Sequence, residues 1–370
     1  MTMAESTRLV DLVQQTIDEY LAERSPQLIQ IAEELAPFVD YSRALLAGGK
    51  RFRALFCYWG WQAVATDDLL DESSAPDFES VRLAAAALEV FHAAALVHDD
   101  IMDNSDTRRG MPAVHRRFQE LHERSQWLGS SIHFGESSAL LLGDLLLSWS
   151  DELFSEGLSK LGDLRARIAA RAEFNLMRTE VTVGQYLDIL EEKAWSRQPE
   201  SALLERAHRV IIFKSAKYSV EAPLAIGASL GGGSLTQLAA LREFGLPLGV
   251  AFQLRDDVLG VFGDPTITGK PAGDDLREGK RTVLIAIARS KLPPSARRLV
   301  DELLGDPEIT DLQVELLQNT IRESGALDDL ELIIEQNLAV ALAAVVDAPL
   351  GRAAKRQLTG LAETVTRRTS

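Results

Sequence analysis

The spacing of apolar residues constrains this chain most, because it repeats every three to four residues in segment after segment. The clearest cases are residues 203–230 and 331–348, which are rich in Ala, Leu and Glu. Runs of β-branched residues with alternating polarity are scarce, and no G-x-G-x-x-G turn follows a strand-like segment. The pattern predicts an all-α protein and argues against a Rossmann domain.

Turn-forming residues interrupt the helical pattern at three places, residues 66–80, 191–200 and 263–280. None of the three resembles a low-complexity linker, and the sequence shows no repeat of fixed period. The last stretch has no predicted element, and a loop of that length inside a compact domain is usually functional or disordered. We expect it to be functional.

The short connections predict one domain over residues 1–370, built as a helical bundle. Within it we expect a core at about 40–290, which carries the motifs described below, and further helices at 291–365.

Composition excludes several classes of protein. The net charge of −16 argues against a nucleic-acid partner, which demands a basic face. The single cysteine, Cys57, forms no intrachain disulfide and is expected to be structural. The first residues lack the basic start and apolar run of a signal peptide, so we expect a cytoplasmic protein. The most apolar stretch, residues 83–97, is shorter than the roughly 18 residues of a spanning helix, so no membrane span is expected.

The segment HDDIMDNSDTRRG, residues 98–110, gathers carboxylates immediately before two arginines. Asp99 and Asp103 are spaced to share one face at the C-terminal end of an apolar helix, where the partial negative charge of the helix opposes them. A hard cation such as Mg²⁺ would offset that repulsion. Arginine suits bidentate binding of phosphate oxygens, so Arg108 and Arg109 complete a candidate Mg²⁺–diphosphate site. The alternative is a solvated acidic helix end.

The segment FQLRDDVLGVFGD, residues 252–264, repeats the theme. Asp256 and Asp257 again end an apolar helix, and Gln253 lies one turn before Asp256. Two such carboxylate ends, brought face to face in a helical bundle, would hold several metal ions around one polyanion. Either cluster alone is weak evidence for a site, and the pair is strong evidence.

Candidate cations near the amino end lie in GGKRFR, residues 48–53. Lys50 and Arg53 are spaced i, i+3 and are expected on one helix face, while the glycines would let a ligand approach the backbone. His92 lies two turns before Asp99 on the same face. A lone histidine in such a position is more often a satisfied interior residue than a ligand.

Three lysines are further candidates. Lys214 lies in an apolar helix, where the usual alternative is a surface lysine that extends its stem over apolar neighbours. Lys270 and Lys280 lie in the 263–280 stretch, where the alternative is simple solubility. No single one of these cations is strong evidence for a binding site, and the interpretation depends on all of them together.

Together these stretches resemble the trans-isoprenyl diphosphate synthases, or polyprenyl synthetases, of isoprenoid biosynthesis. The matching motifs lie between residues 48 and 282 and are GGKRFR, HDDIMDNSDTRRG, GQYLDI, FKSAKYS, FQLRDD and TGKPAGDDLREGKRT. The resemblance implies the type I isoprenoid synthase fold, an all-α bundle around a deep central cavity. It also implies Mg²⁺-dependent, head-to-tail condensation of isopentenyl diphosphate with an allylic diphosphate, by a homodimer.

The resemblance also implies residue roles. Asp99 and Asp103 would bind Mg²⁺ directly with Asp100 in support, and Asp256 would bind a further Mg²⁺ with help from Asp257. About three Mg²⁺ ions would act in each site, and Mn²⁺ would be able to substitute. The catalytic set would be Asp99, Asp100, Asp103, Arg108, Lys214, Asp256 and Lys270. The allylic diphosphate would be held by Arg108, Lys214, Gln253 and Lys270, with Ser215 and Lys280 nearby. Isopentenyl diphosphate would be held by Lys50, Arg53, His92 and Arg109.

One position departs from the family pattern. The second aspartate motif usually ends in a third aspartate, and here that position is Gly260. Asp264 follows four residues later and is not assumed to replace it. The resemblance implies that the third aspartate acts through the outer metal shell, so we expect weaker metal binding at most. Ser215 stands where many relatives have Thr, which keeps the hydroxyl.

The implied chemistry requires no protein nucleophile. The allylic C–O bond breaks first, and metal ions with fixed cations stabilise the charge that develops on the diphosphate. The double bond of isopentenyl diphosphate then attacks, and the departing diphosphate takes the proton. An apolar cavity, closed by residues 263–280, would keep water from the carbocation.

Product length is predicted from the helix before the first cluster. One helical turn rises about 5.4 Å, roughly one isoprene unit. Short-chain relatives place large aromatics where this chain has Ala94 and Ala95, so a product longer than C15 is expected. Phe91 or Trp149 would form a deeper floor, which predicts geranylgeranyl diphosphate (C20), with a longer polyprenyl diphosphate as the alternative. Ala94→Phe should then shorten the product. Alternatively, the two alanines only permit close helix packing.

Three other classes of protein remain as alternatives. A class I terpene cyclase shares the first aspartate cluster but needs no isopentenyl diphosphate site, and the N-D-x-x-S-x-x-x-E motif of cyclases is absent from the sequence. A non-catalytic partner subunit tends to lose the aspartates or lysines that this chain retains. A helical scaffold with acidic helix ends does not explain six ordered motifs.

Overall fold

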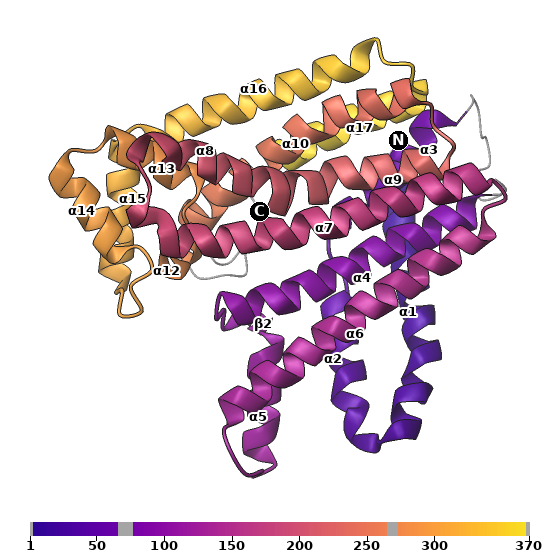
Figure 1. The fold of residues 1–370 in the computed structure, drawn as a ribbon, viewed down its shortest axis with the longest axis horizontal. Helices are drawn as coiled ribbons and strands as arrows, with labels where there is room; N and C mark the ends of the chain where they lie inside the picture. Colours follow the sequence, from indigo (N-terminus) through magenta and orange to yellow (C-terminus); the bar gives the residue numbers. More distant parts are fainter. Residues whose placement is uncertain (1–2, 66–76, 265–272, 368–370) are drawn as a thin grey trace. The chain divides into compact units, whose positions relative to one another are not determined.

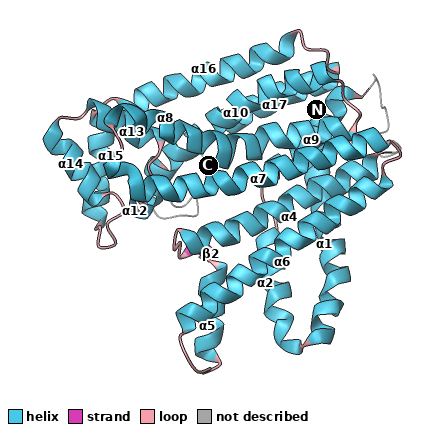
Figure 2. Ribbon diagram, in the orientation of Figure 1, coloured by secondary structure: helices cyan, strands magenta, loops and turns pink. Residues whose placement is uncertain are grey.

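The computed structural model describes residues 3–65, 77–264 and 273–367, with side chains from residue 8 onward within those ranges. Over these residues the regular elements are helices, joined by loops, except for one short hairpin, which confirms the prediction of an all-α protein (Figure 2). The hairpin pairs β1 (Thr107–Arg108) with β2 (Met111–Pro112), and the spacing of apolar residues gave no sign of it.

The chain divides into two compact units. Unit 1 comprises Met1–Arg171 and Ile226–Gly233, and unit 2 comprises Ala172–Ala225 and Ser234–Ser370. The single domain and the central cavity expected from the sequence stay predictions.

Unit 1 is organised around its most apolar helix. Its elements are α1 (Met3–Ile31), η1 (Glu33–Leu35), α2 (Ala36–Leu46), α3 (Phe52–Val64), α4 (Phe78–Met102), the hairpin, α5 (Val114–Arg124) and α6 (Ser131–Lys160). Helix α4 lies alongside α6 and also contacts α1 and α3 (Figure 1). Residues of α4 are buried on several sides, as expected of a helix that is apolar around most of its surface.

Helix α4 extends beyond the most apolar stretch, residues 83–97, at both ends. Within the described residues it is the one helix with the length and composition to cross a membrane, with 25 residues and a mean hydropathy of 1.5 in its most apolar window. Within that window 78% of the residues are buried inside the protein, and the core helix of a soluble protein passes the same test. The absence of a membrane span stays a prediction.

Helices α7 (Leu164–Ala194) and α9 (Ala222–Leu230) each begin in one unit and end in the other. The remaining elements of unit 2 are η3 (Trp195–Arg197), α8 (Glu200–Val210), η4 (Ile211–Glu221), α10 (Leu235–Phe262), α12 (Asp274–Glu278), α13 (Val283–Lys291), α14 (Pro294–Leu303), α15 (Asp311–Glu323), α16 (Ala326–Val346) and α17 (Arg352–Thr366). The predicted helix at 203–230 is therefore three consecutive segments, and the middle one, η4, is a π-helix.

Helix α10 is the centre of unit 2 and packs against η4 and α16. It begins at a capping box in which Ser234 and Gln237 satisfy each other's backbone N–H groups. It runs on to Phe262, so Asp256 and Asp257 lie within its last two turns and do not end the helix as predicted.

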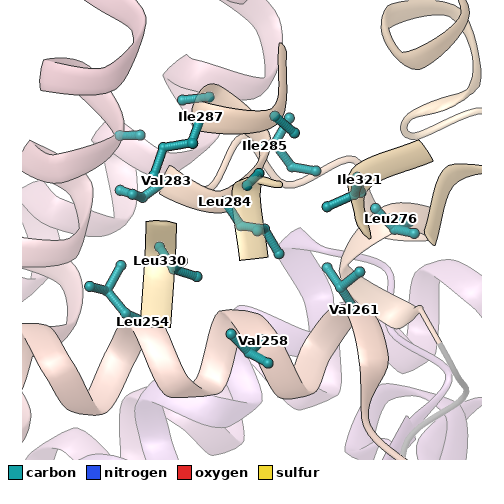
Figure 3. Close-up of a cluster of buried hydrophobic side chains, with 14 of the residues drawn as sticks. Leu254, Val258, Val261, Leu276, Val283, Leu284, Ile285, Ile287, Ile321 and Leu330 are labelled. Atoms are coloured by element: carbon teal, nitrogen blue, oxygen red, sulfur yellow. The ribbon is translucent and has the colours of Figure 1, made fainter. Parts of the chain in front are cut away.

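The main core of unit 2 lies beside the C-terminal half of α10. Figure 3 shows Leu254, Val258 and Val261 of α10 close to apolar side chains of α12, α13, α15 and α16. Leu276 of α12 has no exposed surface and belongs to this core. The stretch 263–280 is therefore not an uninterrupted loop, because a short helix inside it is anchored by a buried leucine. Residues 265–272 lie outside the described residues.

Candidate active site

The first acidic cluster lies at the C-terminal end of α4 in unit 1, as predicted. Helix α4 ends at Met102, and Asp103 is its C-cap, with a backbone N–H that donates to the Asp99 carbonyl at 2.8 Å. Asp99 keeps 19% of its side chain exposed, whereas Asp100 keeps 1%. The helix therefore holds Asp99 at a surface and turns Asp100 into the protein.

The β1–β2 hairpin turns Arg108 back onto this helix end. Its two central residues, Arg109 and Gly110, both have positive φ, 53° and 73°, as in a type I′ hairpin turn. Arg108 Nε donates to Asp100 Oδ1 at 2.8 Å, and its Nη2 donates to the same oxygen. Its Nη2 also lies 3.8 Å from Asp99 Oδ2. Asp100 therefore fixes the guanidinium beside Asp99.

Arg109 points toward the segment GGKRFR. Its Nη1 donates to the Leu45 carbonyl at 3.2 Å, and its guanidinium lies against Gly49, where a Cβ atom would be 3.6 Å from Nη2. Desolvation and the nearby Arg51 guanidinium lower the pKa of Arg109. The structure thus brings the two basic motifs of unit 1 together.

His92 belongs to the same basic region. Desolvation, followed by the charges of Arg53 and Arg109, holds its pKa well below the ordinary value of 6.5. His92 is therefore neutral at pH 7. Lys50 is exposed and precedes α3, which begins at Phe52, so the predicted shared helix face of Lys50 and Arg53 is wrong.

Sequence reasoning missed the ion pair that supports this region. Arg51 and Glu89 are both 4% exposed, and Arg51 Nη1 lies 3.3 Å from Glu89 Oε2. Glu89 Oε1 also accepts from the backbone N–H of Ala54 at 3.2 Å, and Arg51 Nη2 donates to Gln14 Oε1 at 2.6 Å. Arg51 has a left-handed backbone, with φ 51°, which is costly for a residue with a side chain. The sequence held one indication of this ion pair: Glu89 is an acidic residue inside the most apolar stretch, residues 83–97.

The second acidic cluster lies on α10 in unit 2. Asp257 is 4% exposed, and its Oδ1 accepts from Gln253 Nε2 at 2.9 Å. Its Oδ2 is buried and has no hydrogen-bond partner among the described residues. Desolvation, followed by repulsion from Asp275, holds the pKa of Asp257 well above 3.8. Asp256 next to it keeps part of its surface exposed.

Helix α12 and the residues just after it bring two more charged groups, Asp275 and Lys280, to this cluster. Lys280 Nζ lies 3.6 Å from Asp275 Oδ1 and also pairs with Glu278. Lys280 therefore joins the second cluster in the structure. Lys270, predicted as a further ligand, lies outside the described residues.

Lys214 lies on the π-helix η4 and is paired. Its Nζ donates to Asp188 of α7, while Lys217 Nζ lies 2.5 Å from Glu180 Oε1, also of α7. Gly184 lies midway between those two acids, and a Cβ atom there would be 2.4 Å from the backbone nitrogen of Lys214. The motif GQYLDI thus provides both the close approach and the partner that position Lys214. Ser215, the next residue, is partly buried.

The four residues predicted to set product length occupy different environments in unit 1. Ala94 has no exposed surface, whereas Ala95 is partly exposed and lies one turn before Asp99 on the same face of α4. Phe91 is 5% exposed. Trp149 of α6 packs edge-on against Tyr20 of α1, with ring centroids 6.1 Å apart, and it lines a hollow of about 520 Å³ together with Arg24 and Glu152.

The donor chemistry of both clusters fits a hard cation. The groups are carboxylate oxygens, and one of them, Asp257 Oδ2, is buried without a hydrogen-bond donor in the described part of the chain. Mg²⁺ ordinarily takes one or two carboxylates and completes its shell with water and phosphate oxygens. Among the described residues, no group of three His, Cys, Asp or Glu side chains is close enough to hold a metal ion unaided.

Comparison with known proteins decides the family. Residues 36–321 match the sequence profile of the family described as polyprenyl synthetase. The chain belongs to the polyprenyl synthetase family. The resemblance carried by the six motifs is thereby confirmed.

Other members of the polyprenyl synthetase family match most of the chain. A short chain isoprenyl diphosphate synthase from Methanocaldococcus jannaschii is 32% identical over 295 residues, which cover 78% of this chain and 79% of the relative. A geranylgeranyl diphosphate synthase from Methanosarcina mazei is 32% identical over 321 residues, which cover 85% of this chain and 86% of the relative.

A solved structure shows the same architecture. The crystal structure of geranylgeranyl pyrophosphate synthase from Corynebacterium glutamicum, complexed with isoprenyl diphosphate and magnesium, gives a TM-score of 0.88 at 38% identity. The match covers 98% of this chain and 99% of that chain. The all-α fold predicted from the motifs, that of the type I isoprenoid synthases, is therefore confirmed.

Proposed function

We propose that this polyprenyl synthetase is a Mg²⁺-dependent prenyltransferase, which condenses isopentenyl diphosphate head-to-tail with allylic diphosphates to give a trans-polyprenyl diphosphate. The observation that carries the proposal is the family match over residues 36–321, in a chain that retains the aspartates of both clusters. Relatives named as geranylgeranyl or short-chain isoprenyl diphosphate synthases support it.

In unit 1 the proposal assigns metal binding to Asp99 and Asp103 and gives Asp100 a supporting role. That role agrees with the burial of Asp100 and its hydrogen bonds from Arg108. Held in this way, Arg108 presents a fixed positive charge to the allylic diphosphate, and a preorganised charge needs no reorganisation during the reaction. When bound, Mg²⁺ neutralises the charge that develops on the departing diphosphate.

The other basic residues of unit 1 are assigned to isopentenyl diphosphate. They are Lys50, Arg53, His92 and Arg109. A neutral His92 is able to donate or accept one hydrogen bond beside the guanidiniums of Arg53 and Arg109. These groups bind and orient the nucleophilic substrate, and none of them forms a covalent bond with it.

In unit 2, Asp256 would bind a further Mg²⁺ with Asp257 behind it. The side chains assigned to the allylic diphosphate there are Lys214, Gln253 and Lys270, with Ser215 and Lys280 nearby. Asp188 and Gly184 position Lys214, and Asp257 holds Gln253 through its hydrogen bond. The departing diphosphate takes the proton, so no protein base is required.

The proposed product is geranylgeranyl diphosphate (C20), with a longer polyprenyl diphosphate as the alternative. Small side chains at Ala94 and Ala95 support a product beyond C15. Use of about three Mg²⁺ ions, replacement by Mn²⁺, a homodimeric state and a cytoplasmic location belong to the same proposal.

Incorporation of labelled isopentenyl diphosphate into extractable product tests the proposal. With an allylic primer, we expect incorporation that requires Mg²⁺ and that falls by at least about a hundredfold in Asp103→Asn and in Asp256→Asn. Asp347→Asn makes the same charge change at an exposed residue and should retain full incorporation. A protein that forms cyclic hydrocarbons from the primer alone would be a cyclase instead.

A further inference from the structure

We propose that Asp275 of α12 supplies the third carboxylate that position 260 of the second cluster lacks, and that Gly260 leaves the space for it. The inference rests on the proposed function and concerns how the second cluster holds Mg²⁺ and diphosphate.

The space beside Gly260 is occupied by the Asp275 side chain. A Cβ atom at Gly260 would lie 2.1 Å from Asp275 Oδ2 and 2.4 Å from its Cγ. Real Cβ atoms do not approach other atoms so closely, so a side chain at position 260 and the observed Asp275 carboxylate exclude one another. The carboxylate thus lies where the first atom of a side chain at position 260 would be.

Helix α12 is held firmly enough to fix Asp275 there. Leu276, the next residue, is fully buried in the core of unit 2 beside Val261 (Figure 3). Its carbonyl accepts from the Gly305 backbone N–H at 3.0 Å. Arg277 Nη1 donates to the Ile309 carbonyl at 3.2 Å. These contacts tie the two residues after Asp275 to the core and to the chain before α15.

The surrounding charges indicate that the cluster is completed by a cation. Asp257 Oδ2 is buried without a hydrogen-bond donor in the described part of unit 2. Lys280 lies 3.6 Å from Asp275 but also pairs with Glu278. A buried carboxylate with partly buried acids beside it favours a bound hard cation, because the positive charge offsets the cost of desolvation.

Asp264 is a poorer candidate for the same role. It follows the end of α10 at Phe262 and is exposed, whereas Asp275 is partly buried and touches the space beside Gly260 itself. The replacement therefore comes from a different helix of unit 2.

Calorimetric titration of the full-length protein with inorganic pyrophosphate, with and without Mg²⁺, tests the proposal. We expect Asp275→Asn to weaken Mg²⁺-dependent pyrophosphate binding about tenfold or more. Gly260→Ala should weaken Mg²⁺-dependent pyrophosphate binding to a similar extent, because the added methyl group displaces the Asp275 carboxylate without providing another carboxylate. Asp347→Asn is the matched control, with the same charge change at an exposed site, and should bind as the unmodified protein does.

A carboxylate swap separates this role from a merely structural one. Gly260→Asp combined with Asp275→Ala places the carboxylate on α10 and removes the clashing group from α12. The double variant should bind Mg²⁺–pyrophosphate more tightly than Asp275→Ala alone. Equal binding by these two variants, or unaltered binding by Asp275→Asn, would overturn the inference. Incorporation of isopentenyl diphosphate by the unmodified protein is measured separately. If incorporation occurs, either of these binding results contradicts only the role of Asp275. If no incorporation occurs, the proposed function itself is contradicted.

Discussion

At the scale of single residues, the charged groups are positioned partly by their spacing along one helix and partly by the packing of helices against each other. The i, i+4 spacing of Asp99 and Asp103 is enough to place them together at a helix end. The pairs Arg51–Glu89 and Lys214–Asp188 join residues 38 and 26 positions apart, so they depend on how helices pack. The contact between Gly260 and Asp275 depends on packing in the same way.

Glu89→Gln tests the buried pair in unit 1. Loss of the carboxylate leaves the Arg51 guanidinium buried without its counter-charge, which costs about 3 kcal/mol or more. Denaturant unfolding should show that loss of stability, and the KM for isopentenyl diphosphate should rise because Arg51 no longer fixes the basic segment. Glu79→Gln removes an exposed acid from the same helix and should change stability by less than about 1 kcal/mol. Equal losses in both variants would contradict the role given to the buried pair.

His92 predicts a pH dependence of stability. Its pKa in the folded protein lies below the unfolded value of 6.5, so the unfolded state binds the proton more readily. The associated stability is present above pH 6.5 and is lost as the pH falls below it, by up to about 1.4 kcal/mol per pH unit. His92→Gln should therefore show a smaller fall in unfolding free energy between pH 7.5 and pH 5.5. If the unfolding free energy of His92→Gln falls as much as that of the unmodified protein, groups other than His92 cause the pH dependence.

At the scale of elements, the helices were predictable and their irregularities were not. Apolar periodicity marked residues 203–230 as helical, yet it could not show the π-helix η4 at their centre. The π-helix is accommodated by glycines on its neighbours. A Cβ atom at Gly184 would be 2.4 Å from Lys214 N, and one at Gly249 would be 2.4 Å from the Ala216 carbonyl oxygen. Such close approaches depend on the packing of three helices and leave no periodic signal.

Gly184→Ala should push η4 away from α7. We expect a loss of about 1–3 kcal/mol in unfolding free energy and a lower kcat, because Lys214 moves with the backbone. Gly360→Ala, in α17, meets no atom within 4 Å and should be neutral or slightly stabilising. If Gly184→Ala has the activity and stability of the unmodified protein, η4 does not need the close approach of its backbone to position 184.

Ala95 offers the sharper test of product length on α4. It is partly exposed on the face that carries Asp99, whereas Ala94 has no exposed surface, so a large side chain at 94 also overpacks the core. Ala95→Phe should shift the product toward C15 at nearly unchanged stability. A product distribution equal to that of the unmodified protein would remove Ala95 from the determinants of length.

At the scale of the whole molecule, six motifs in a fixed order along the chain are enough to indicate the family. The all-α fold follows from that resemblance and from the periodicity of apolar residues. The division into two compact units does not follow from either, because it depends on which helices pack together. The short helix α12 has no periodic pattern to indicate it, since a single buried leucine holds it in place.

The most direct test of the central claim is to size the products of the purified protein. The protein is incubated with Mg²⁺, labelled isopentenyl diphosphate and, separately, dimethylallyl, geranyl or farnesyl diphosphate, and the products are dephosphorylated and measured. We predict incorporation from all three primers that converges on one C20 alcohol. Products of C30 or longer would keep the chemistry and contradict the assigned length, whereas no incorporation from any primer would contradict the proposed function itself.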